Sequence, residues 1–288
     1  MTISPESILS SFPKHQSTNI GDLLERSDFN GCFPELAQTE NLNPEQLLPL
    51  ASAFSIAPVS GFHVGAIAIG PSGHGYIGAN MEFVGMPLNA SLHAEQSAIL
   101  NAWMHGEPSI EAIYISALPC GHCRQFMCEL PKRDQISIII EGKTHMLQDL
   151  LPQPFGEARR PGESLLGNHH NPITGLSANE DALSQRAINA AERSYVPYSN
   201  TPEGFAIECA DGHAYAGRAA ESVAFNPSVP AVLCALNLKN LSASRSYSIN
   251  RCVQTKLVTG LNSSTDFTRA VLKAISNANL ETVSIEKG

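Results

Sequence analysis

The chain of 288 residues repeats part of its own sequence, and this repeat restricts the possible folds more than any other feature. The segment 55–82 aligns without a gap to the segment 194–221, with nine identities in 28 positions. Turn glycines and a proline are among the shared residues, so similar composition does not explain the match. Self-similarity at a fixed offset indicates a duplicated structural unit. We therefore expect two domains that share one fold.

The first repeat contains a clear order of strands and helices. Periodicity and turn residues predict a hairpin over 61–79, a helix capped by Ser91 that runs to Trp103 or Met104, a strand over 112–117, a helix that begins after Pro119-Cys120 and is ended by Pro131, and a strand over 136–140. The order β-β-α-β-α-β places helices against a sheet, and strands joined through a helix are expected to be parallel. The predicted fold class is therefore α/β.

Segments of different character flank the two repeats. Residues 1–47 show helix-like spacing, with Asn43 able to cap a helix and Pro44 at its first position. Residues 153–176 are rich in Pro, Gly, Asn and Arg and show little periodicity, which is typical of a linker. The expected division is a helical segment at 1–47, a first domain at 48–150, a linker at 151–180 and a second domain at 181–288.

Composition limits the class of partner. The formal net charge of -9 disfavours nucleic acid as a partner, because its binding relies on Lys and Arg neutralising phosphates. The N-terminus has no basic segment followed by an apolar run, and no stretch approaches the ~18 apolar residues that would span a bilayer. We therefore expect a cytoplasmic protein with no membrane partner. Three of the seven cysteines cluster, and in a reducing compartment such a cluster indicates metal binding or catalysis before a disulfide.

The clearest chemistry lies in His93-Ala94-Glu95 and, 25 residues after the glutamate, in the sequence Pro-Cys-Gly-His-Cys that contains Cys120 and Cys123. Each group lies at the N-terminus of a predicted helix, whose dipole lowers the pKa of a thiol. Two thiolates and the imidazole of His93 provide three zinc ligands, whereas a structural zinc site normally has four. This count favours a catalytic zinc with one position open to water. Alone, the C-x-x-C pair would also fit a redox pair or half of a structural zinc site, and His122 is an alternative ligand.

Glu95 lies two residues after the expected histidine ligand, beside the open position. A carboxylate there can take the proton of a metal-activated water and deliver it to a substrate. The H-A-E and P-C-x-x-C motifs resemble those of the zinc-dependent cytidine deaminase superfamily. The segment 119–125, with the sequence PCGHCRQ, is similar to the cytidine-specific members, and the two-copy arrangement resembles the long homodimeric bacterial type. The resemblance covers nearly the whole chain.

The resemblance implies a duplicated three-layer α/β/α sandwich with a mixed sheet and one zinc ion per chain, held by His93, Cys120 and Cys123. Glu95 is then the proton shuttle: as water attacks C4 of the pyrimidine, it protonates N3 and then the departing amine. The implied substrate-binding residues are Asn80 and Glu82 for the ribose hydroxyls, Phe62 for the base, the Ala94 carbonyl for the exocyclic amine, and Phe155, which reaches the neighbouring subunit's site in a homodimer. The implied reaction converts cytidine and 2′-deoxycytidine to uridine and 2′-deoxyuridine plus ammonia, in pyrimidine salvage.

The second repeat is not expected to hold this centre. At the offset of the repeat, His93 corresponds to Val232 and Glu95 to Cys234, and no C-x-x-C follows. We expect an inactive scaffold that buries surface on the first domain and supports a two-fold dimer, with Glu221 kept for turn or strand geometry. Two alternatives stay open. One is a base or nucleotide deaminase of the same superfamily, and the other is a non-enzymatic zinc-stabilised binding or assembly module.

Overall fold

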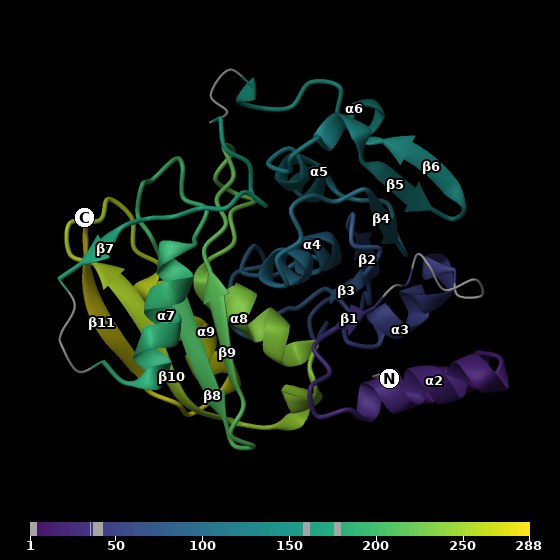
Figure 1. Ribbon diagram of the computed structural model, residues 1–288, viewed down its shortest axis with the longest axis horizontal. Coiled ribbons are helices and arrows are strands. Elements are labelled where there is room, and N and C mark those ends of the chain that lie inside the picture. The colour runs from purple at the N-terminus through teal and green to yellow at the C-terminus, as the bar shows by residue number, and fades with distance from the viewer. Residues whose placement is uncertain (1–4, 35, 37–42, 158–161, 176–179) are drawn as a thin grey trace.

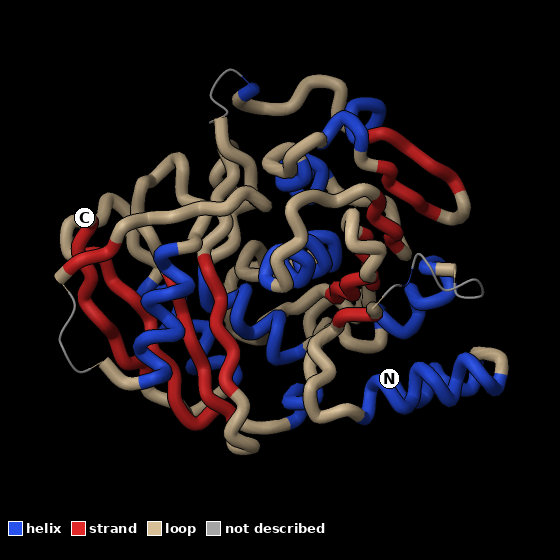
Figure 2. The backbone as a smooth tube through the Cα atoms, in the orientation of Figure 1, coloured by secondary structure: helices blue, strands red, loops and turns tan. Residues whose placement is uncertain are grey.

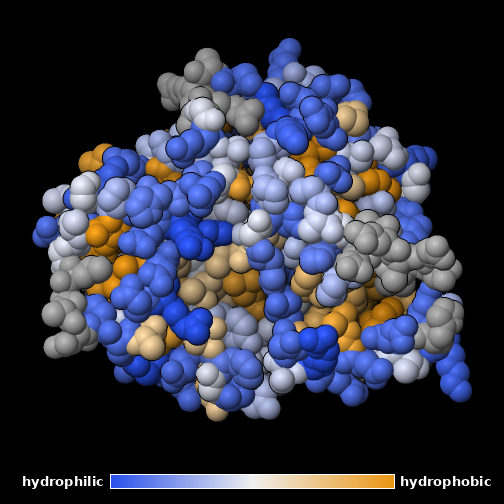
Figure 3. All heavy atoms as spheres, in the orientation of Figure 1, coloured by the Kyte–Doolittle hydropathy of each residue, from blue (hydrophilic) through white to orange (hydrophobic). Residues whose placement is uncertain are grey.

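Two sheets, each covered by helices, lie side by side in the computed structural model (Figure 1). The structure describes residues 5–34, 36, 43–157, 162–175 and 180–288. The tube view shows the strands in two separate groups, and the labels of Figure 1 identify the group on the right as β1 to β6 and the group on the left as β7 to β11 (Figure 2). The face seen in this orientation is mostly hydrophilic (Figure 3). None of the helices in the described ranges has the length and the apolar composition that a bilayer-spanning helix requires.

The first sheet has six strands in the order β1-β3-β2-β4-β5-β6. Their bounds are β1 Cys32–Phe33, β2 Gly65–Ile69, β3 Gly75–Ala79, β4 Ala112–Ile115, β5 Ser137–Ile140 and β6 Lys143–Met146. Strands β4 and β5, which are joined through a helix, are parallel, and the other neighbours are antiparallel. The predicted hairpin and the mixed sheet are thus confirmed. The edge strands β1 and β6 are additions that the sequence pattern did not predict.

Helices cover both faces of this sheet. Because successive side chains of a strand point to opposite faces, Ile67 and Ile77 pack in one apolar cluster and Ala66 and Tyr76 in another. The first cluster includes residues of α2 (Lys14–Glu25) and α3 (Leu48–Ser52), and the second includes residues of α4 (Ala94–Met104) and α5 (Gly121–Met127). The other short helices in the described part of this half are α1 Pro5–Ile8, η1 Leu9–Ser11, η3 Pro44–Leu47, η4 Arg133–Gln135 and α6 Leu147–Leu150. This is the expected three-layer sandwich.

Two predicted helix boundaries are wrong. The N-cap of α4 is His93 rather than Ser91, because Leu92 pairs with Met81 through two backbone hydrogen bonds and keeps the preceding chain extended. Helix α5 ends at Met127 rather than continuing to Pro131, since the backbone from Cys128 onward forms tight turns. The cap at Asn43 is confirmed: its side chain accepts from the backbone N–H of Glu45 at the start of η3.

The second half repeats this architecture. Its sheet has the order β7-β11-β10-β8-β9, so that β9-β8-β10-β11 correspond to β3-β2-β4-β5. The strands are β7 Ile173–Thr174, β8 Gly204–Cys209, β9 Ala214–Arg218, β10 Ile249–Leu257 and β11 Leu280–Lys287, and the helices are α7 Ala182–Glu192, α8 Ala231–Asn240, η6 Ala243–Ser246 and α9 Thr265–Ile275. Strands β10 and β11 are parallel, as β4 and β5 are. We call the elements α3 to α6 the first copy and α7 to β11 the second copy.

Helices α4 and α8 lie together at the centre of the molecule and join the two copies (Figure 1). The Ser97 hydroxyl donates to Asn237 Oδ1 (2.5 Å), and Asn237 Nδ2 donates to the Ser97 carbonyl (3.0 Å). One apolar cluster contains residues of both helices and of both sheets. The copies therefore share a core instead of touching through their surfaces alone.

Close packing at two glycines corrects the alignment of the repeats. A Cβ atom on Gly78 would lie 2.2 Å from the Ala98 nitrogen of α4, and one on Gly217 would lie 2.2 Å from the Ala235 nitrogen of α8. Matching these contacts shows that the loop before the helix is two residues shorter in the second copy. The position of His93 is therefore occupied by Pro230 and not by Val232.

The shift moves the glutamate position as well: Glu95 corresponds to Val232 and not to Cys234. Antiparallel bridges locate the deletion, since Met81 pairs with Leu92 in the first copy and Ala220 pairs with Val229 in the second. The second copy still has no metal ligand at either helix position.

Candidate active site

Three side chains from the first copy converge as the sequence predicts. Cys120 Sγ lies 3.4 Å from His93 Nδ1, Cys123 Sγ lies 3.3 Å from the same nitrogen, and the two sulfurs are 3.7 Å apart. Within the described ranges, these residues form the one group of His, Cys, Asp or Glu side chains with metal-binding spacing. His122 does not belong to it; its ring stacks on His93 with centroids 4.8 Å apart.

The spacing of these atoms fits zinc. Tetrahedral zinc with ordinary bond lengths of about 2.3 Å to sulfur and about 2.0 Å to nitrogen places two sulfurs about 3.8 Å apart and sulfur about 3.5 Å from nitrogen. The three distances in the structure are within about 0.3 Å of these edges. The group supplies three protein ligands, so a fourth position stays open to water or a substrate.

Local structure places each ligand at the start of a helix. His93 is the N-cap of α4 and Cys120 is the N-cap of α5. Arg124, one turn into α5, donates from Nε to the Pro119 carbonyl (2.8 Å) and from Nη1 to the Leu150 carbonyl (2.7 Å). These bonds fix the chain immediately before Cys120. Cys128, the C-cap of α5, is buried and directs its thiol at the Arg124 carbonyl rather than at the metal-ligand group.

Electrostatics favour a bound cation between the sulfurs. Hydrogen bonds from Cys123 and His93 lower the pKa of Cys120 to about 3. The neighbouring sulfur and burial raise the pKa of Cys123 well above its ordinary value, because a second negative charge there has no compensation from the protein. A divalent metal provides that compensation and deprotonates a coordinating thiol.

Glu95 lies in the first turn of α4, two residues after His93, and is 5% exposed. Burial raises the pKa of its carboxyl group, because the charged form loses hydration. A carboxyl group that holds a proton more tightly than usual is suited to exchange that proton with a reacting group.

A cavity of about 270 Å³ opens beside the metal-ligand group. Its lining contains Phe62, Asn80, Glu82, His93, Ala94, Glu95 and Cys120, together with Ser60, Val64, Ser91, Leu92, Ala117 and Leu118. Seven of the residues predicted for the site thus meet in one place. A larger cavity of about 840 Å³ lies near the other end of α4, beside Trp103 and Arg218, and does not contain the metal-ligand group.

Asn80 and Glu82 shape the loop that borders this cavity. Asn80 Oδ1 accepts from the Ser55 hydroxyl (2.6 Å), and its Nδ2 donates to the Phe62 carbonyl (2.9 Å). Glu82 Oε2 accepts from the backbone N–H of Val59 (3.0 Å). Although burial opposes it, hydrogen bonds from Ser60 and Val59 lower the pKa of Glu82, which is therefore an anion at neutral pH.

Phe62 and Ala94 both line the cavity but differ in their exposure. The Phe62 ring is 61% exposed, which leaves its face free to contact a planar ligand. Ala94 is buried at the first position of α4, directly between a metal ligand and Glu95.

Family comparison identifies the chain. Residues 43–138 match a model of the cytidine and deoxycytidylate deaminase zinc-binding region, and residues 147–277 match a second model with the same description. The chain belongs to the cytidine and deoxycytidylate deaminase family. It is a deaminase with two deaminase-like domains, and the His93, Cys120 and Cys123 group in the first of them suits the zinc that the family binds.

Solved structures of cytidine deaminases are similar to about two fifths of this deaminase. That from Mycobacterium tuberculosis is 30% identical over 40% of this chain and 92% of that chain, with a TM-score of 0.35. That from Mycobacterium leprae is 30% identical over 38% and 94%, with a TM-score of 0.35. That from Burkholderia pseudomallei is 28% identical over 39% and 96%, with a TM-score of 0.34.

Two of the predicted site residues do not line the cavity of the deaminase: Cys123, which is buried behind it in the metal-ligand group, and Phe155, which belongs to neither. The Phe155 ring is 60% exposed, and its backbone is held to α5 by Gln125, whose side chain accepts from the Phe155 N–H (2.9 Å) and donates to its carbonyl (3.2 Å). Its role at a neighbouring subunit's site stays a prediction. Sequence reasoning also missed Gln96, which accepts from the His93 N–H; the usual capping signature starts with Ser, Thr, Asp or Asn, so a histidine cap hides it.

Proposed function

We propose that this deaminase converts cytidine and 2′-deoxycytidine to uridine and 2′-deoxyuridine, with release of ammonia. The observation that supports the proposal most is the single cavity in which the zinc-ligand group, the buried Glu95 and the polar pair Asn80 and Glu82 meet. A nucleoside has a base to be hydrolysed and a ribose with hydroxyls to be bound, and the cavity offers partners for both.

Glu95 handles the protons of the reaction. Zinc, when bound by His93, Cys120 and Cys123, lowers the pKa of water at its open position and makes it a nucleophile. Glu95 would carry two protons in turn, the first from water to N3 of the base and the second from the resulting hydroxyl group to the departing amine, and its raised pKa suits it to this shuttle. The atoms balance, since the water supplies the new carbonyl oxygen and two protons, of which one stays on N3 of the product and the other leaves with the amine as ammonia.

The remaining cavity residues hold the nucleoside. Glu82 accepts three hydrogen bonds within the protein, which leaves acceptor capacity for a ribose hydroxyl, and Asn80 retains a free N–H donor. Phe62 provides an exposed ring for stacking on the pyrimidine. The Ala94 carbonyl is proposed to accept from the exocyclic amine, which would orient C4 towards the metal side of the cavity.

Charge and size favour a nucleoside over a nucleotide. No Lys or Arg is among the described residues that line the cavity, and Glu82 contributes a negative charge. A phosphate group would have no cationic partner there. The volume of about 270 Å³ also lies at the lower end of the range of small-molecule sites.

We extend the proposal to a homodimer in which Phe155 reaches the partner's cavity. Support comes from the exposure of Phe155 and of three apolar residues that a partner would cover: Leu118, which lines the cavity, and Val84 and Leu88, which lie in the chain between the lining residues Glu82 and Ser91. All seven cysteines lie in described residues and none is in a disulfide, which fits a reducing compartment and a place in cytoplasmic pyrimidine salvage.

Ultraviolet absorbance tests the proposed reaction, because the conversion of cytidine to uridine changes the spectrum of the base. Zinc-loaded wild type should turn over cytidine, and Glu95→Gln should lose about 10³-fold in kcat while it retains zinc by metal analysis. Glu111→Gln, which changes an exposed carboxylate of the same copy, is the matched control and should keep the wild-type rate. Wild type that binds zinc but leaves cytidine unchanged would refute the proposal.

The same assay separates the alternatives. A base or nucleotide deaminase of this family would act on cytosine or cytidine monophosphate in preference to cytidine. A non-enzymatic zinc-stabilised module would convert none of the three and would be indifferent to Glu95→Gln in both zinc content and folding.

A further inference from the structure

One loop of the second copy contacts both segments that supply the metal ligands. This loop, residues 222–228, accepts a hydrogen bond at the Pro227 carbonyl from Gln96 Nε2 (2.8 Å) and donates one from the Val223 N–H to Glu129 Oε1 (2.9 Å). Gln96 lies three residues after His93 on α4, and Glu129 lies six residues after Cys123, just beyond α5. The loop therefore connects the histidine segment to the cysteine segment.

Both ends of the Gln96 amide are engaged. Its Oε1 accepts from the His93 N–H (3.3 Å) in a capping box, while its Nε2 donates to Pro227 in the other copy. The side chain is 1% exposed. A rotation of the amide would break both bonds inside the protein, where water cannot replace them, so the backbone of His93 is tied to the second copy.

Glu129 anchors the other segment in the same way. Its side chain is fully buried and accepts from the hydroxyl groups of Tyr195 (2.8 Å) and Tyr198 (2.7 Å) as well as from Val223. All three donors belong to the second copy. Since a buried carboxylate needs such partners, the chain just after α5 is held firmly against that copy.

The second copy lacks the equivalent of the Gln96 device. Its helix α8 begins after Pro230, which has no backbone N–H to be capped, and the position of Gln96 is taken by Leu233. Pro230 and Leu233 thus belong to a helix start that carries no metal ligand. The capping amide thus occurs in the copy where the N-cap is itself a metal ligand.

We propose that Gln96 and Glu129 are positioning residues through which loop 222–228 of the second copy holds His93 and the cysteine helix at metal-binding separation. The second copy then contributes to zinc affinity without touching the metal. Groups that orient the ligands of a metal commonly change its affinity by about 10- to 100-fold when they are lost. The inference rests on the zinc centre of the proposed function and not on the choice of substrate.

Zinc release to a chromogenic chelator, measured on the full zinc-loaded chain without substrate, tests the role of Gln96. Gln96→Met keeps the length of the side chain and removes both hydrogen bonds, and it should release zinc at least about 10-fold faster than wild type. Asn240→Leu is the matched control, because it removes a different bond between the two halves, from Asn240 Nδ2 to the Phe54 carbonyl (2.8 Å). It should lower the unfolding midpoint and leave zinc release within twofold of wild type.

Two results would overturn the proposal. The first is a Gln96→Met protein that releases zinc within twofold of wild type, with only a lowered midpoint like that of Asn240→Leu. If Gln96→Met does not fold, Gln96→Asn carries the same expectation, because its shorter amide cannot reach both partners. The second comes from a double-mutant cycle with Glu129→Gln, in which the fold-changes of the two single variants in the rate of zinc release simply multiply in the double variant. Two residues that act through one loop should instead be coupled.

The outcome is distinct from a failure of the proposed function. A chain that does not deaminate cytidine can still show the predicted difference in zinc release, and a cytidine deaminase can still release zinc at an unchanged rate in Gln96→Met.

Discussion

The two copies hold the loop before their hairpins by the same hydrogen bonds. Glu82 accepts from the N–H groups of Val59 and Ser60 (both 3.0 Å), and Glu221 accepts from those of Tyr198 (2.9 Å) and Ser199 (3.0 Å). The second copy has kept this glutamate although the described part of that copy contains no metal-ligand group. The carboxylate is thus part of the fold in both copies, as expected for Glu221, and any role in binding a ribose is additional to it.

The copies differ where the central helix begins. In the first copy, Val64 lines the cavity and the start of α4 faces the metal-ligand group. In the second copy the corresponding residue is Glu203, whose carboxylate accepts from the Ala231 N–H (2.9 Å) at the start of α8 and from the Ser264 hydroxyl (2.6 Å). A negative group at a helix N-terminus is stabilising. The second copy fills this position with its own side chain, whereas the first copy leaves it open for a ligand.

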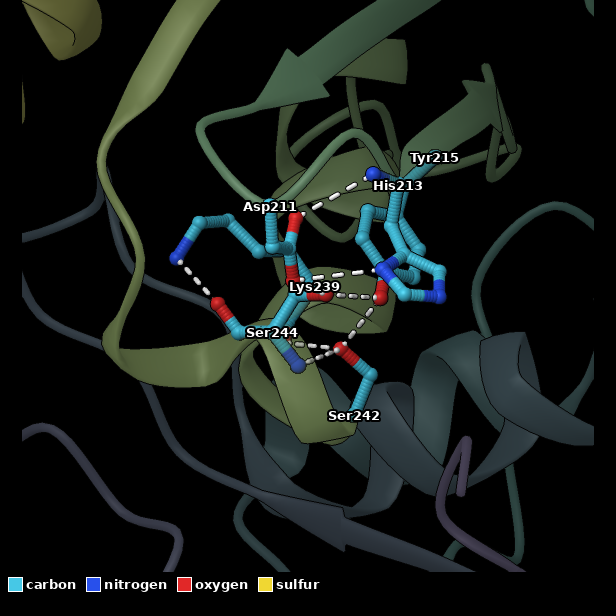
Figure 4. Close-up of polar contacts among 6 residues, drawn as sticks. All are labelled: Asp211, His213, Tyr215, Lys239, Ser242 and Ser244. Carbon is cyan, nitrogen blue, oxygen red and sulfur yellow. Dashed lines mark hydrogen bonds and ion pairs between the residues drawn. The ribbon is translucent and has the colours of Figure 1, made fainter. Parts of the chain in front are cut away.

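A polar network beyond the hairpin has its carboxylate on a different element in each copy. In the second copy the Ser244 hydroxyl donates to Asp211 (2.6 Å) and the Tyr215 hydroxyl donates to Ser244 (2.7 Å), as Figure 4 shows. The corresponding residues of the first copy are Glu107, Ser72 and Tyr76, and there Ser72 and Tyr76 both donate to Glu107. The carboxylate has moved from the end of the helix to the turn of the hairpin. Either arrangement ties the helix end to the hairpin, so the fold constrains the network more than its individual residues.

The largest expected difference between the copies concerns zinc. Cys120→Ser should lose most of the bound zinc and with it the activity, because a hydroxyl is a poor ligand for this metal. Cys234→Ser should keep one zinc per chain. The substitution gives the second copy the residue found at the equivalent position of the first copy, Ser97. Ser97 accepts from the Ala79 N–H (3.0 Å), as Cys234 does from the backbone of Arg218. Metal analysis after gel filtration measures both. Equal zinc loss in the two variants would contradict the comparison.

Periodicity and turn residues predicted the hairpin, the central helices and the buried strands of the first copy, because these elements are long enough to show a pattern. Strands β1 and β7, of two residues each, are too short for that and depend on their sheet neighbours. The cap of α4 was misplaced for a similar reason: pairing of Leu92 with Met81, distant in sequence, decides where the helix begins. Tertiary contacts override local signals at such boundaries.

The metal-ligand group could be predicted from sequence because its spacing is set by helix starts and short turns. The second copy was harder to align beyond Glu221, because the two-residue deletion ends the gapless match there. The packing of α8 against β9 assigns Pro230 and Val232, and with this shift Asn89, Ser91 and Ala94 match Asn226, Ser228 and Ala231. Links between the copies, such as Gln96 with Pro227, join residues 131 positions apart and leave no local pattern.

A smaller effect is expected from the glutamate that both copies keep. Glu82→Gln and Glu221→Gln should each cost about 1 kcal/mol of stability, because a neutral amide oxygen accepts more weakly than a carboxylate. Glu82→Gln should in addition raise KM for cytidine by about 10-fold, corresponding to about 1.4 kcal/mol of lost binding. Denaturant unfolding and steady-state kinetics separate the two effects. If KM for cytidine also rises in Glu221→Gln, or does not rise in Glu82→Gln, the two glutamates do not differ in substrate binding. Both would then be assigned to the fold alone.

The smallest effect concerns the pH dependence of stability and tests the carboxylate that fills the second copy. Burial raises the pKa of Glu203, so the folded chain binds a proton there more tightly than the unfolded chain does. Stability should therefore fall as pH rises from the unfolded value of about 4.5 through the raised folded value. Glu203→Gln cannot ionise and should lack this part of the fall, whereas Glu281→Gln, which removes an exposed carboxylate of β11, should retain it. Unfolding midpoints of the zinc-loaded proteins between pH 4.5 and 7.5 measure the difference. If the midpoints of wild type and Glu203→Gln change in parallel with pH, the two hydrogen bonds to Glu203 fully offset the effect of burial on its pKa.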